Sequence, residues 1–412
     1  MESLKTLKSR WPCARMHGHL RIVSSLNAWS LLIGWTVFAA DSRAFSQEWP
    51  MFRGGQSQTG VASETRKIRP QPTQGLSPKS LPDAMDLLWK YKTDGPVLSS
   101  AVVSDGRVFI GSGNNHVHAI DFKTGNQLWT FPTQASVEAP PMVLGNTVYV
   151  GSTDSIFYAI AAAGGSLKWQ FESNDKIVGS ANWTTLDSGK SRIIIFGSYD
   201  GALYALDAET GEMKWRYESQ NYINGSPAVV NHRILIGGCD AMIHCLSAGD
   251  GFAVSSFDTK AYIAASVVYD GTYAFVGNFA NQFLCVDIPN QKLVWEYKDR
   301  NFPFFSSAAV NDDVVVFGSR DRRVHCVNRR TGAQIWTFRT QGNVDSSPVI
   351  CGNEVVVGSE DGRLYRLQLQ DGKEVLSYEI GSDIVGSPAV ANGVIIVGAE
   401  DGGVYAFGKK EK

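Results

Sequence analysis

Apolar and polar positions alternate along most of the chain in short runs, and each run is closed by a polar turn. The stretch ALYALDAETGEMKW at 202–215 is typical, with an alternating run, a turn that ends in Gly211 and then Trp215. Similar stretches end at Trp129, Trp169 and Trp336. Alternation over so few residues predicts β-strands, because an amphipathic helix would repeat its apolar residues every three or four positions.

The position of Trp215 recurs about every 40 residues. It is occupied by Trp89, Trp129, Trp169, Trp215, Ser255, Trp295, Trp336 and Leu376. Every step is 40 or 41 residues except one of 46, which reflects an insertion between Ser180 and Gly197 that we expect in a loop. A period near 40 with strand and turn chemistry is typical of four-stranded propeller blades.

One repeat unit predicts four strands, at 225–230, 233–238, 242–247 and 253–257. Pairs that tolerate positive φ, such as Asp200-Gly201 and Thr210-Gly211, form the turns. The last unit, at 384–407, lacks its outer strand, which the strand at 87–91 is free to supply. The sequence therefore predicts an all-β fold: an eight-bladed β-propeller of four-stranded antiparallel blades over 87–408, closed by the N-terminal strand.

The recurring tryptophans have a structural explanation. On an outer strand, each indole can bury roughly 150–250 Å² against the next blade, and its N–H needs a hydrogen-bond acceptor. We expect the polar turn just before each tryptophan to supply that acceptor. Trp89, Trp129, Trp169, Trp215, Trp295 and Trp336 are therefore predicted to be structural docking residues with no catalytic role.

The N-terminus has the pattern of a Sec-type signal peptide, predicted over 1–44. Five basic residues precede an apolar run at 28–40, which is too short to span a bilayer. Cys13 lies before that run, so it cannot be a lipid-bearing cysteine, and we expect a periplasmic or secreted protein without a lipid anchor. An uncleaved membrane anchor is the alternative. Residues 45–86 are interpreted as a leading segment and linker, and 409–412 as a charged tail.

Charge and cysteine content exclude several classes of function. The net charge is −2, and residues 1–47 carry six basic and two acidic side chains, so the remainder is acidic overall. An acidic chain is not expected to bind nucleic acid or an anionic membrane surface. Five cysteines follow the leader, without a C-x-x-C pair, which predicts neither a disulfide framework nor a zinc site.

Two repeat units carry the pattern A-x-D-x-x-T-G-x-x-x-W, in Ala205 to Trp215 and Ala119 to Trp129. This pattern resembles the docking motif of the pyrroloquinoline quinone (PQQ)-type propeller repeat. The segment WPMFRGGQSQTG at 49–60 is similar to the start of many exported bacterial proteins of that class. The resemblance implies one of two branches: quinoprotein dehydrogenases with PQQ and calcium at the axis, or scaffolds of the BamB-like outer-membrane assembly factor family.

The dehydrogenase branch would need oxygen ligands for calcium near the axis. One equivalent position in the loops that lead into the inner strands holds Leu98, Glu138, Val178, Asn224, Ala264, Phe305, Asp345 and Val385. Glu138, Asn224 and Asp345 are its oxygen donors and the candidate cofactor-binding residues, but blades 2, 4 and 7 carry them. The adjacent-cysteine pair and the long insertions of related quinoproteins are missing. We therefore predict no metal and no cofactor, with PQQ and calcium as the alternative.

The remaining reactive side chains fall at repeat positions. His118, His244 and His325 share a third-strand position with tyrosines and a leucine, which indicates packing. The position of Ala119 and Ala205 is occupied by cysteine in three other units, at Cys245, Cys285 and Cys326, and we expect these cysteines to be small buried residues. No hydrolase, metalloprotease or phosphate-loop motif occurs.

The sequence thus favours an exported, non-catalytic, monomeric scaffold that binds protein or peptide partners in the cell envelope. The candidate contacts are Tyr222, Arg300, Phe302 and Phe305, in the loops at 219–225 and 298–305. Exposed aromatic residues with arginine are typical of interfaces. The competing interpretation is that Phe304 and Phe305 plug the channel. A PQQ- and calcium-dependent dehydrogenase and a carbohydrate-binding propeller, with Tyr222, Phe305 and Trp183 at one mouth, remain as alternatives.

Overall fold

The computed structural model describes residues 48–62, 81–186, 189 and 191–410. The signal peptide expected at 1–44, part of the linker and the end of the charged tail lie outside the described residues. Phe45–Lys412 form one compact unit. None of the helices in the described part of the chain is long and apolar enough to span a bilayer.

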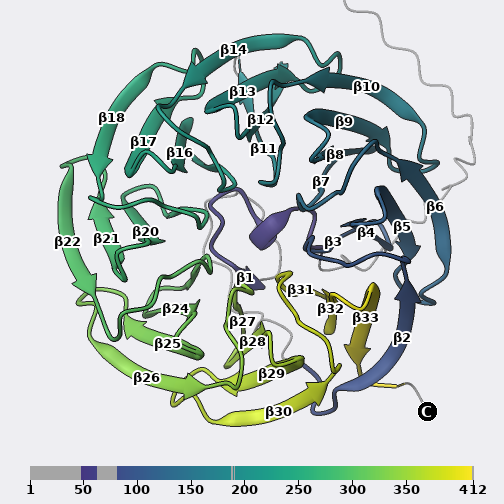
Figure 1. Cartoon of the computed structure of the whole chain (residues 1–412), viewed down its shortest axis with the longest axis vertical. Helices are drawn as coiled ribbons and strands as arrows, with labels where there is room; N and C mark the ends of the chain where they lie inside the picture. Colours follow the sequence, from purple (N-terminus) through teal and green to yellow (C-terminus); the bar gives the residue numbers. More distant parts are fainter. Residues whose placement is uncertain (1–47, 63–80, 187–188, 190, 411–412) are drawn as a thin grey trace, which may run out of the picture. The chain divides into compact units, whose positions relative to one another are not determined.

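The described residues form eight sheets arranged as blades around an axis (Figure 1). Each blade has four antiparallel strands, and β1 (Val61–Ala62) adds a fifth strand, which pairs parallel with β27 (Val349–Cys351). Blade 1 contains β3 (Val102–Ser104), β4 (Arg107–Ser112), β5 (His116–Asp121) and β6 (Gln127–Pro132), and blade 2 contains β7 (Met142–Leu144), β8 (Thr147–Gly151), β9 (Ile156–Ala161) and β10 (Leu167–Glu172). Blade 3 contains β11 (Asn182–Leu186), β12 (Ser191–Gly197), β13 (Ala202–Asp207) and β14 (Met213–Glu218). Blade 4 contains β15 (Ala228–Val230), β16 (Arg233–Gly237), β17 (Met242–Ser247) and β18 (Ala253–Asp258).

The other four blades follow the same order from the axis outward. Blade 5 contains β19 (Val268–Tyr269), β20 (Tyr273–Gly277), β21 (Phe283–Asp287) and β22 (Lys292–Tyr297), and blade 6 contains β23 (Ala309–Val310), β24 (Val314–Ser319), β25 (Arg323–Asn328) and β26 (Gln334–Arg339). Blade 7 contains β27 (Val349–Cys351), β28 (Glu354–Gly358), β29 (Arg363–Gln368) and β30 (Glu374–Glu379). Blade 8 contains β31 (Ala389–Ala391), β32 (Val394–Gly398), β33 (Gly403–Gly408) and β2 (Asp86–Lys92).

The predicted architecture is confirmed, including the closure of the ring. β2 pairs antiparallel with β33, with Leu87 opposite Phe407 and Tyr91 opposite Val404. The first and last strands of the ring therefore share a sheet, which leaves no blade incomplete and no extra sheet edge open. The insertion between Ser180 and Gly197 was expected in a loop, but part of it lengthens β11 and β12, where Thr185 pairs with Arg192 and Leu186 with Ser191.

Apolar side chains are buried between neighbouring blades. One cluster joins Leu235 and Ile243 of blade 4 to Val276 and Val286 of blade 5. The three cysteines predicted to be small buried residues are buried, and each lies opposite the docking position of its own blade, as Cys326 does opposite Trp336. Burial raises the pKa of the Cys326 thiol to about 12.

Each of the six tryptophans of the docking position donates its indole N–H to a turn of the next blade, whereas we expected the acceptor in the turn just before the tryptophan. Trp129 Nε1 donates to the carbonyl of Ala162 at 3.0 Å, and Ala162 lies in the β9–β10 turn of the next blade. The other five indoles make the equivalent bond, to Phe122, Ala208, Ala248, Arg329 and Leu369. The indole of each outer strand packs against the following blade, so the acceptor comes from that blade.

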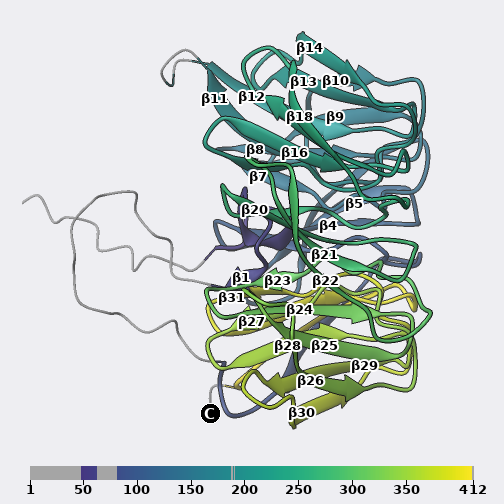
Figure 2. The ribbon, with the colours of Figure 1, turned by 90° about the vertical axis from the view of Figure 1, so that its left-hand side faces the viewer.

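The sequence did not predict the position of residues 48–62, named here the axial segment. It contains η1 (Phe52–Gly54) and β1 (Val61–Ala62), which lie inside the ring (Figure 1) and near one end of it (Figure 2). Trp49 exchanges both backbone hydrogen bonds with Val103. Further backbone carbonyls of the segment accept hydrogen bonds from the amides of Val143, Val229, Tyr269, Val310 and Ile350. The segment thus contacts the inner strands of one blade after another.

Side chains fix the axial segment further. Gln56 Nε2 donates to the carbonyl of Trp183 at 2.5 Å, and Asn182 Nδ2 donates to the carbonyl of Gln56 at 2.8 Å. The buried Arg53 guanidinium donates to the carbonyls of Pro348 at 2.6 Å and Ala308 at 2.5 Å. The segment therefore connects blade 3 to blades 6 and 7 across the axis.

Candidate functional site at the inlet face

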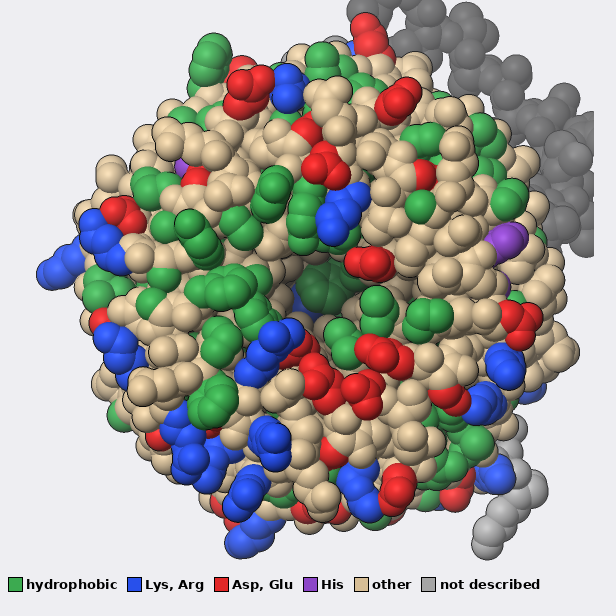
Figure 3. Space-filling model, viewed as in Figure 1, with side chains coloured by type: hydrophobic (Ala, Val, Ile, Leu, Met, Phe, Trp, Pro, Cys, Tyr) green, Lys and Arg blue, Asp and Glu red, His purple; other side chains and the backbone are tan. Residues whose placement is uncertain are grey.

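The loops that lead from one blade into the inner strand of the next are named here the inlet loops. Because the strands of each blade are antiparallel, the inlet loops and the turns between second and third strands lie at the same end of the ring. We call this end the inlet face. The axial segment bonds to the opposite, C-terminal part of the inner strands. Figure 3 looks onto the inlet face and shows a hollow at the axis.

Buried serines hold the inlet loops in register. The backbone amide of Ser226 donates to Ser266 Oγ at 2.9 Å, and the amide of Ser266 donates to Ser307 Oγ at 3.0 Å. The same bond joins Ser180 to Ser226, Ser307 to Ser347, Ser347 to Ser387 and Ser387 to Ser100. Because each serine bonds to the next blade, these contacts fix the loops around the hollow. The recurring Ser-Pro and Ser-Ala pairs were a visible signal of this arrangement.

One side of the inlet face carries five aromatic residues, named here the aromatic arc: Tyr199, Tyr222, Tyr262, Phe279 and Phe305. Tyr199 and Tyr222 stack with ring centroids 5.0 Å apart. Phe279 contacts both Tyr262, at 6.4 Å, and Phe305, at 4.8 Å. Tyr222, Tyr262 and Phe279 are 44–55% exposed, so the arc presents apolar rings to solvent.

The structure separates the four predicted contact residues. Tyr222 and Phe305 belong to the aromatic arc, whereas Phe302 is 45% exposed with no ring contact recorded in the described residues. Arg300 is exposed, with its Nε 3.9 Å from a carboxylate oxygen of Asp321. Sequence reasoning missed Tyr199, Tyr262 and Phe279, which a comparison of the turns between second and third strands would have found together with the inlet loops.

The idea that Phe304 plugs the channel is wrong. Its ring is buried and packs edge-on against Phe283 and Phe317, with centroids 6.0 and 5.3 Å away. These partners belong to blades 5 and 6, so Phe304 is a core residue between blades. The axial segment occupies the axis instead.

The neighbouring part of the inlet face is acidic. Asp345, Glu360 and Asp383, named here the acidic arc, belong to the inlet loops and turn of blades 7 and 8. Burial and the charges of Asp345 and Asp383 raise the pKa of Glu360. Acidic side chains are visible along part of the rim of the hollow (Figure 3).

Arg320 joins the two arcs. Its guanidinium lies over the ring of Phe305, 4.0 Å from the centroid, and its Nη2 donates to Asp345 at 2.6 Å. Arg320 Nε contacts both oxygens of the same carboxylate at 3.1 Å. The carboxylate proposed as a calcium ligand is therefore already held by a guanidinium.

The other two residues of the calcium hypothesis have different surroundings. Asn224 Nδ2 lies 3.2 Å from Cys239 Sγ, and its Oδ1 is buried without a hydrogen-bond partner among the described residues. Glu138 is half-buried, and its charge contributes to the raised pKa of Tyr199, which burial causes in the first place. Glu138, Asn224 and Asp345 remain a prediction as cofactor ligands.

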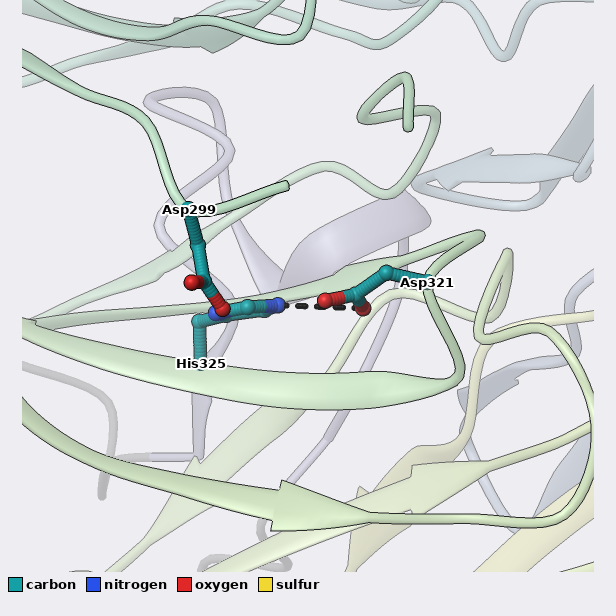
Figure 4. A group of neighbouring side chains, drawn as sticks. All are labelled: Asp299, Asp321 and His325. Carbon is teal, nitrogen blue, oxygen red and sulfur yellow. Dashed lines mark hydrogen bonds and ion pairs between the residues drawn. The ribbon is translucent and has the colours of Figure 1, made fainter. Parts of the chain in front are cut away.

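A second group with ligand-like side chains is formed by Asp299, Asp321 and His325 (Figure 4). His325 Nε2 lies 3.2 Å from Asp321 Oδ1, and its Nδ1 lies 3.0 Å from the hydroxyl of Tyr297. Both ring nitrogens are therefore occupied, and Arg323 and Arg300 lie within about 4 Å of the other oxygen of Asp321. A cation would have to displace these contacts.

The contact between His325 and Asp321 is one copy of a contact that recurs in other blades. In each of six blades, the polar tip of the third-strand residue bonds to the Asp four positions earlier, as Tyr204 does to Asp200 at 2.5 Å. The other pairs are Tyr158–Asp154, His244–Asp240, His325–Asp321, Tyr365–Asp361 and Tyr405–Asp401. The packing role predicted for the histidines is therefore confirmed.

The blade count, the docking turns and the closure define a PQQ-type β-propeller. A family model described as outer membrane protein assembly factor BamB matches residues 82–239 and 320–411, more than half of the chain. The chain belongs to that family. Among curated proteins, no sequence matches it.

Solved structures give the same fold assignment. BamB from Moraxella catarrhalis is 19% identical with a TM-score of 0.65, over 79% of this chain and 100% of that one. Quinohemoprotein alcohol dehydrogenase from Comamonas testosteroni is 16% identical with a TM-score of 0.73, over 89% and 81%. The computationally designed Ika8 protein is 17% identical with a TM-score of 0.68, over 81% and 100%. At such identities the likeness shows the fold alone.

Proposed function

We propose that this protein is a non-catalytic scaffold that binds protein or peptide partners through its inlet face. The observation that carries the proposal is the aromatic arc. Three of its rings are roughly half exposed on a face whose loops are fixed by the serine contacts. Rigid, exposed aromatic rings next to an arginine lose little side-chain entropy on binding, which suits them to interface cores.

The membership of the BamB-described family supports the same proposal. We expect the partners to lie in the cell envelope, since the N-terminal sequence has the pattern of a signal peptide. A periplasmic or secreted monomer without a lipid anchor is the form that we propose. The axial segment bonds to the inner strands and lies near the end away from the inlet face (Figure 2), so we expect a ligand to approach the hollow from the inlet face.

The alternative is a PQQ- and calcium-dependent dehydrogenase, for which the similarity to a quinohemoprotein alcohol dehydrogenase is the supporting observation. Such an enzyme would use Glu138, Asn224 and Asp345. The ion pair of Asp345 with Arg320 disfavours it, because a cation at that carboxylate would lie beside a guanidinium. A carbohydrate-binding propeller has less support, because Trp183 bonds to the axial segment rather than joining the inlet loops.

Calorimetry separates the scaffold from the enzyme. The mature protein is titrated with PQQ in the presence of calcium and then assayed for alcohol- or sugar-dependent dye reduction. We expect neither binding heat nor turnover. Micromolar binding with turnover that is lost in an Asp345→Asn variant would overturn the scaffold proposal.

A further inference from the structure

We infer that the inlet face recognises a peptide segment in which a basic side chain stands close to an aromatic one. The basic side chain would lie against Glu360 and Asp383, and the aromatic one against the aromatic arc. This inference rests on the proposed function and names the chemistry of the partner. It follows from the order in which the two arcs surround the hollow.

The two arcs follow one another around the ring, with Arg320 at their junction. The aromatic arc runs from blade 3 to the loop that enters blade 6, and the acidic arc from the loop that enters blade 7 to the loop that enters blade 8. Arg320, in blade 6, contacts Phe305 on one side and Asp345 on the other. A single ligand at the hollow would therefore meet apolar rings on one side and carboxylates on the other.

The charges of the acidic arc are only partly compensated by the protein. Asp345 is paired with Arg320, while Glu360 accepts only an uncharged bond, from Asn343 Nδ2 at 2.7 Å. Within the residues that the structure describes, no ion pair to Glu360 or Asp383 is recorded. Burial is the first cause of the raised pKa of Glu360, and the like charges of Asp345 and Asp383 raise it further, while the Asn343 hydrogen bond and the charge of Arg320 offset this only in part. A cation supplied by a partner would relieve this repulsion.

The aromatic arc is a less favourable place for the same cation. Lys176 already lies over the Tyr199 ring, 4.3 Å from its centroid, and Arg320 covers Phe305. Cations of the protein thus occupy two of the five rings. The exposed rings of Tyr222, Tyr262 and Phe279 are left to pack against apolar groups, which places the aromatic part of a ligand there.

The test uses the full mature protein and a phage-displayed library of random dodecapeptides. Selections are run on the wild type, on Glu360→Gln/Asp383→Asn, and on Tyr222→Ser/Tyr262→Ser. Glu209→Gln/Glu212→Gln is the matched control, since those carboxylates are about 70% exposed and lie in a β13–β14 turn away from the inlet face. Thermal melting checks that each variant is folded.

We expect the wild type and the control to enrich peptides with Lys or Arg near an aromatic residue. The acidic-arc variant should bind the best such peptide about tenfold more weakly at low salt, with less dependence on ionic strength. Enriched peptides that need the aromatic arc but carry no basic residue would overturn this inference and leave the proposed function standing. If the wild type enriches no peptide at all, or the aromatic variant binds unchanged, the proposed peptide recognition fails as well.

Discussion

Two glycines of blade 2 isolate the contribution of tryptophan docking to stability. Gly165 and Gly145 both have positive φ, 73° and 61°. A Cβ at Gly165 would lie 2.8 Å from the nearest indole atom of Trp129, whereas a Cβ at Gly145 would meet nothing within 4 Å. Alanine at either position therefore has the same backbone strain, and only Gly165→Ala must also move the indole.

The magnitudes follow from these two effects. An L-residue in the left-handed region costs about 1–2 kcal/mol, which is all that we expect for Gly145→Ala. Displacing a packed ring costs about 1–3 kcal/mol more, so Gly165→Ala should lose about 2–5 kcal/mol. The loss of unfolding free energy in Gly165→Ala is larger if the hydrogen bond from Trp129 to Ala162 is lost as well.

Urea unfolding followed by tryptophan fluorescence measures both free energies of unfolding. The wild type and both variants are compared at the same protein concentration, and equal slopes of the transitions confirm that the comparison is valid. The two alanine variants would be equally destabilised if the indole did not depend on a bare glycine. That result would refute the reasoning that each tryptophan is docked on the turn of the next blade.

Three further predictions concern the axis, the core and pH. Arg53→Met should speed hydrogen exchange at the inner-strand amides that bond to the axial segment while leaving the outer-strand amides unchanged. An equal change of the exchange rate in both sets of amides would contradict the role of Arg53 in fixing the axial segment. Phe304→Ala should cost about 3–5 kcal/mol in urea unfolding, whereas Phe302→Ala, at an exposed ring, should stay within about 0.5 kcal/mol. Burial lowers the pKa of His118 from 6.5 to about 4, so the imidazole takes up its proton at a higher pH in the unfolded chain than in the folded protein. The free energy of unfolding should therefore fall by roughly 3 kcal/mol as the pH drops from 6.5 to about 4. Asn114→Asp, which places a carboxylate beside Nε2 of His118, should raise the pKa of His118 measured by NMR and reduce this loss of stability. An unchanged pKa of His118 in this variant would contradict the prediction.

The repeat made most of the fold predictable. The strands predicted at 242–247 and 253–257 agree with β17 and β18 to within one residue, because alternation and turn residues recur in every unit. The axial segment could not be foreseen in the same way. Its contacts use mainly backbone carbonyls, as at Ser57 and Thr59, and such bonds leave no side-chain pattern.

The candidate site was only partly predictable. Comparing one loop position found Phe305 and Asp345, but not their common partner Arg320, which lies in a turn between second and third strands. That turn position holds Tyr199 in blade 3, Phe279 in blade 5, Arg320 in blade 6 and Glu360 in blade 7, so the signal was present in the sequence. Only the fold shows that the two positions face the same hollow.

The proposal that partners dock on the inlet face is tested most directly by site-specific photo-crosslinking in cells that produce the protein. A benzophenone amino acid replaces Tyr222 or Phe302 on the inlet face, and Leu128 or Met213 on outer strands serves as a control of similar exposure, 45–49% in all four cases. The account predicts discrete adducts from Tyr222 and Phe302 and none from the outer strands. Adducts that form equally at Leu128 and Met213, or only there, would contradict it.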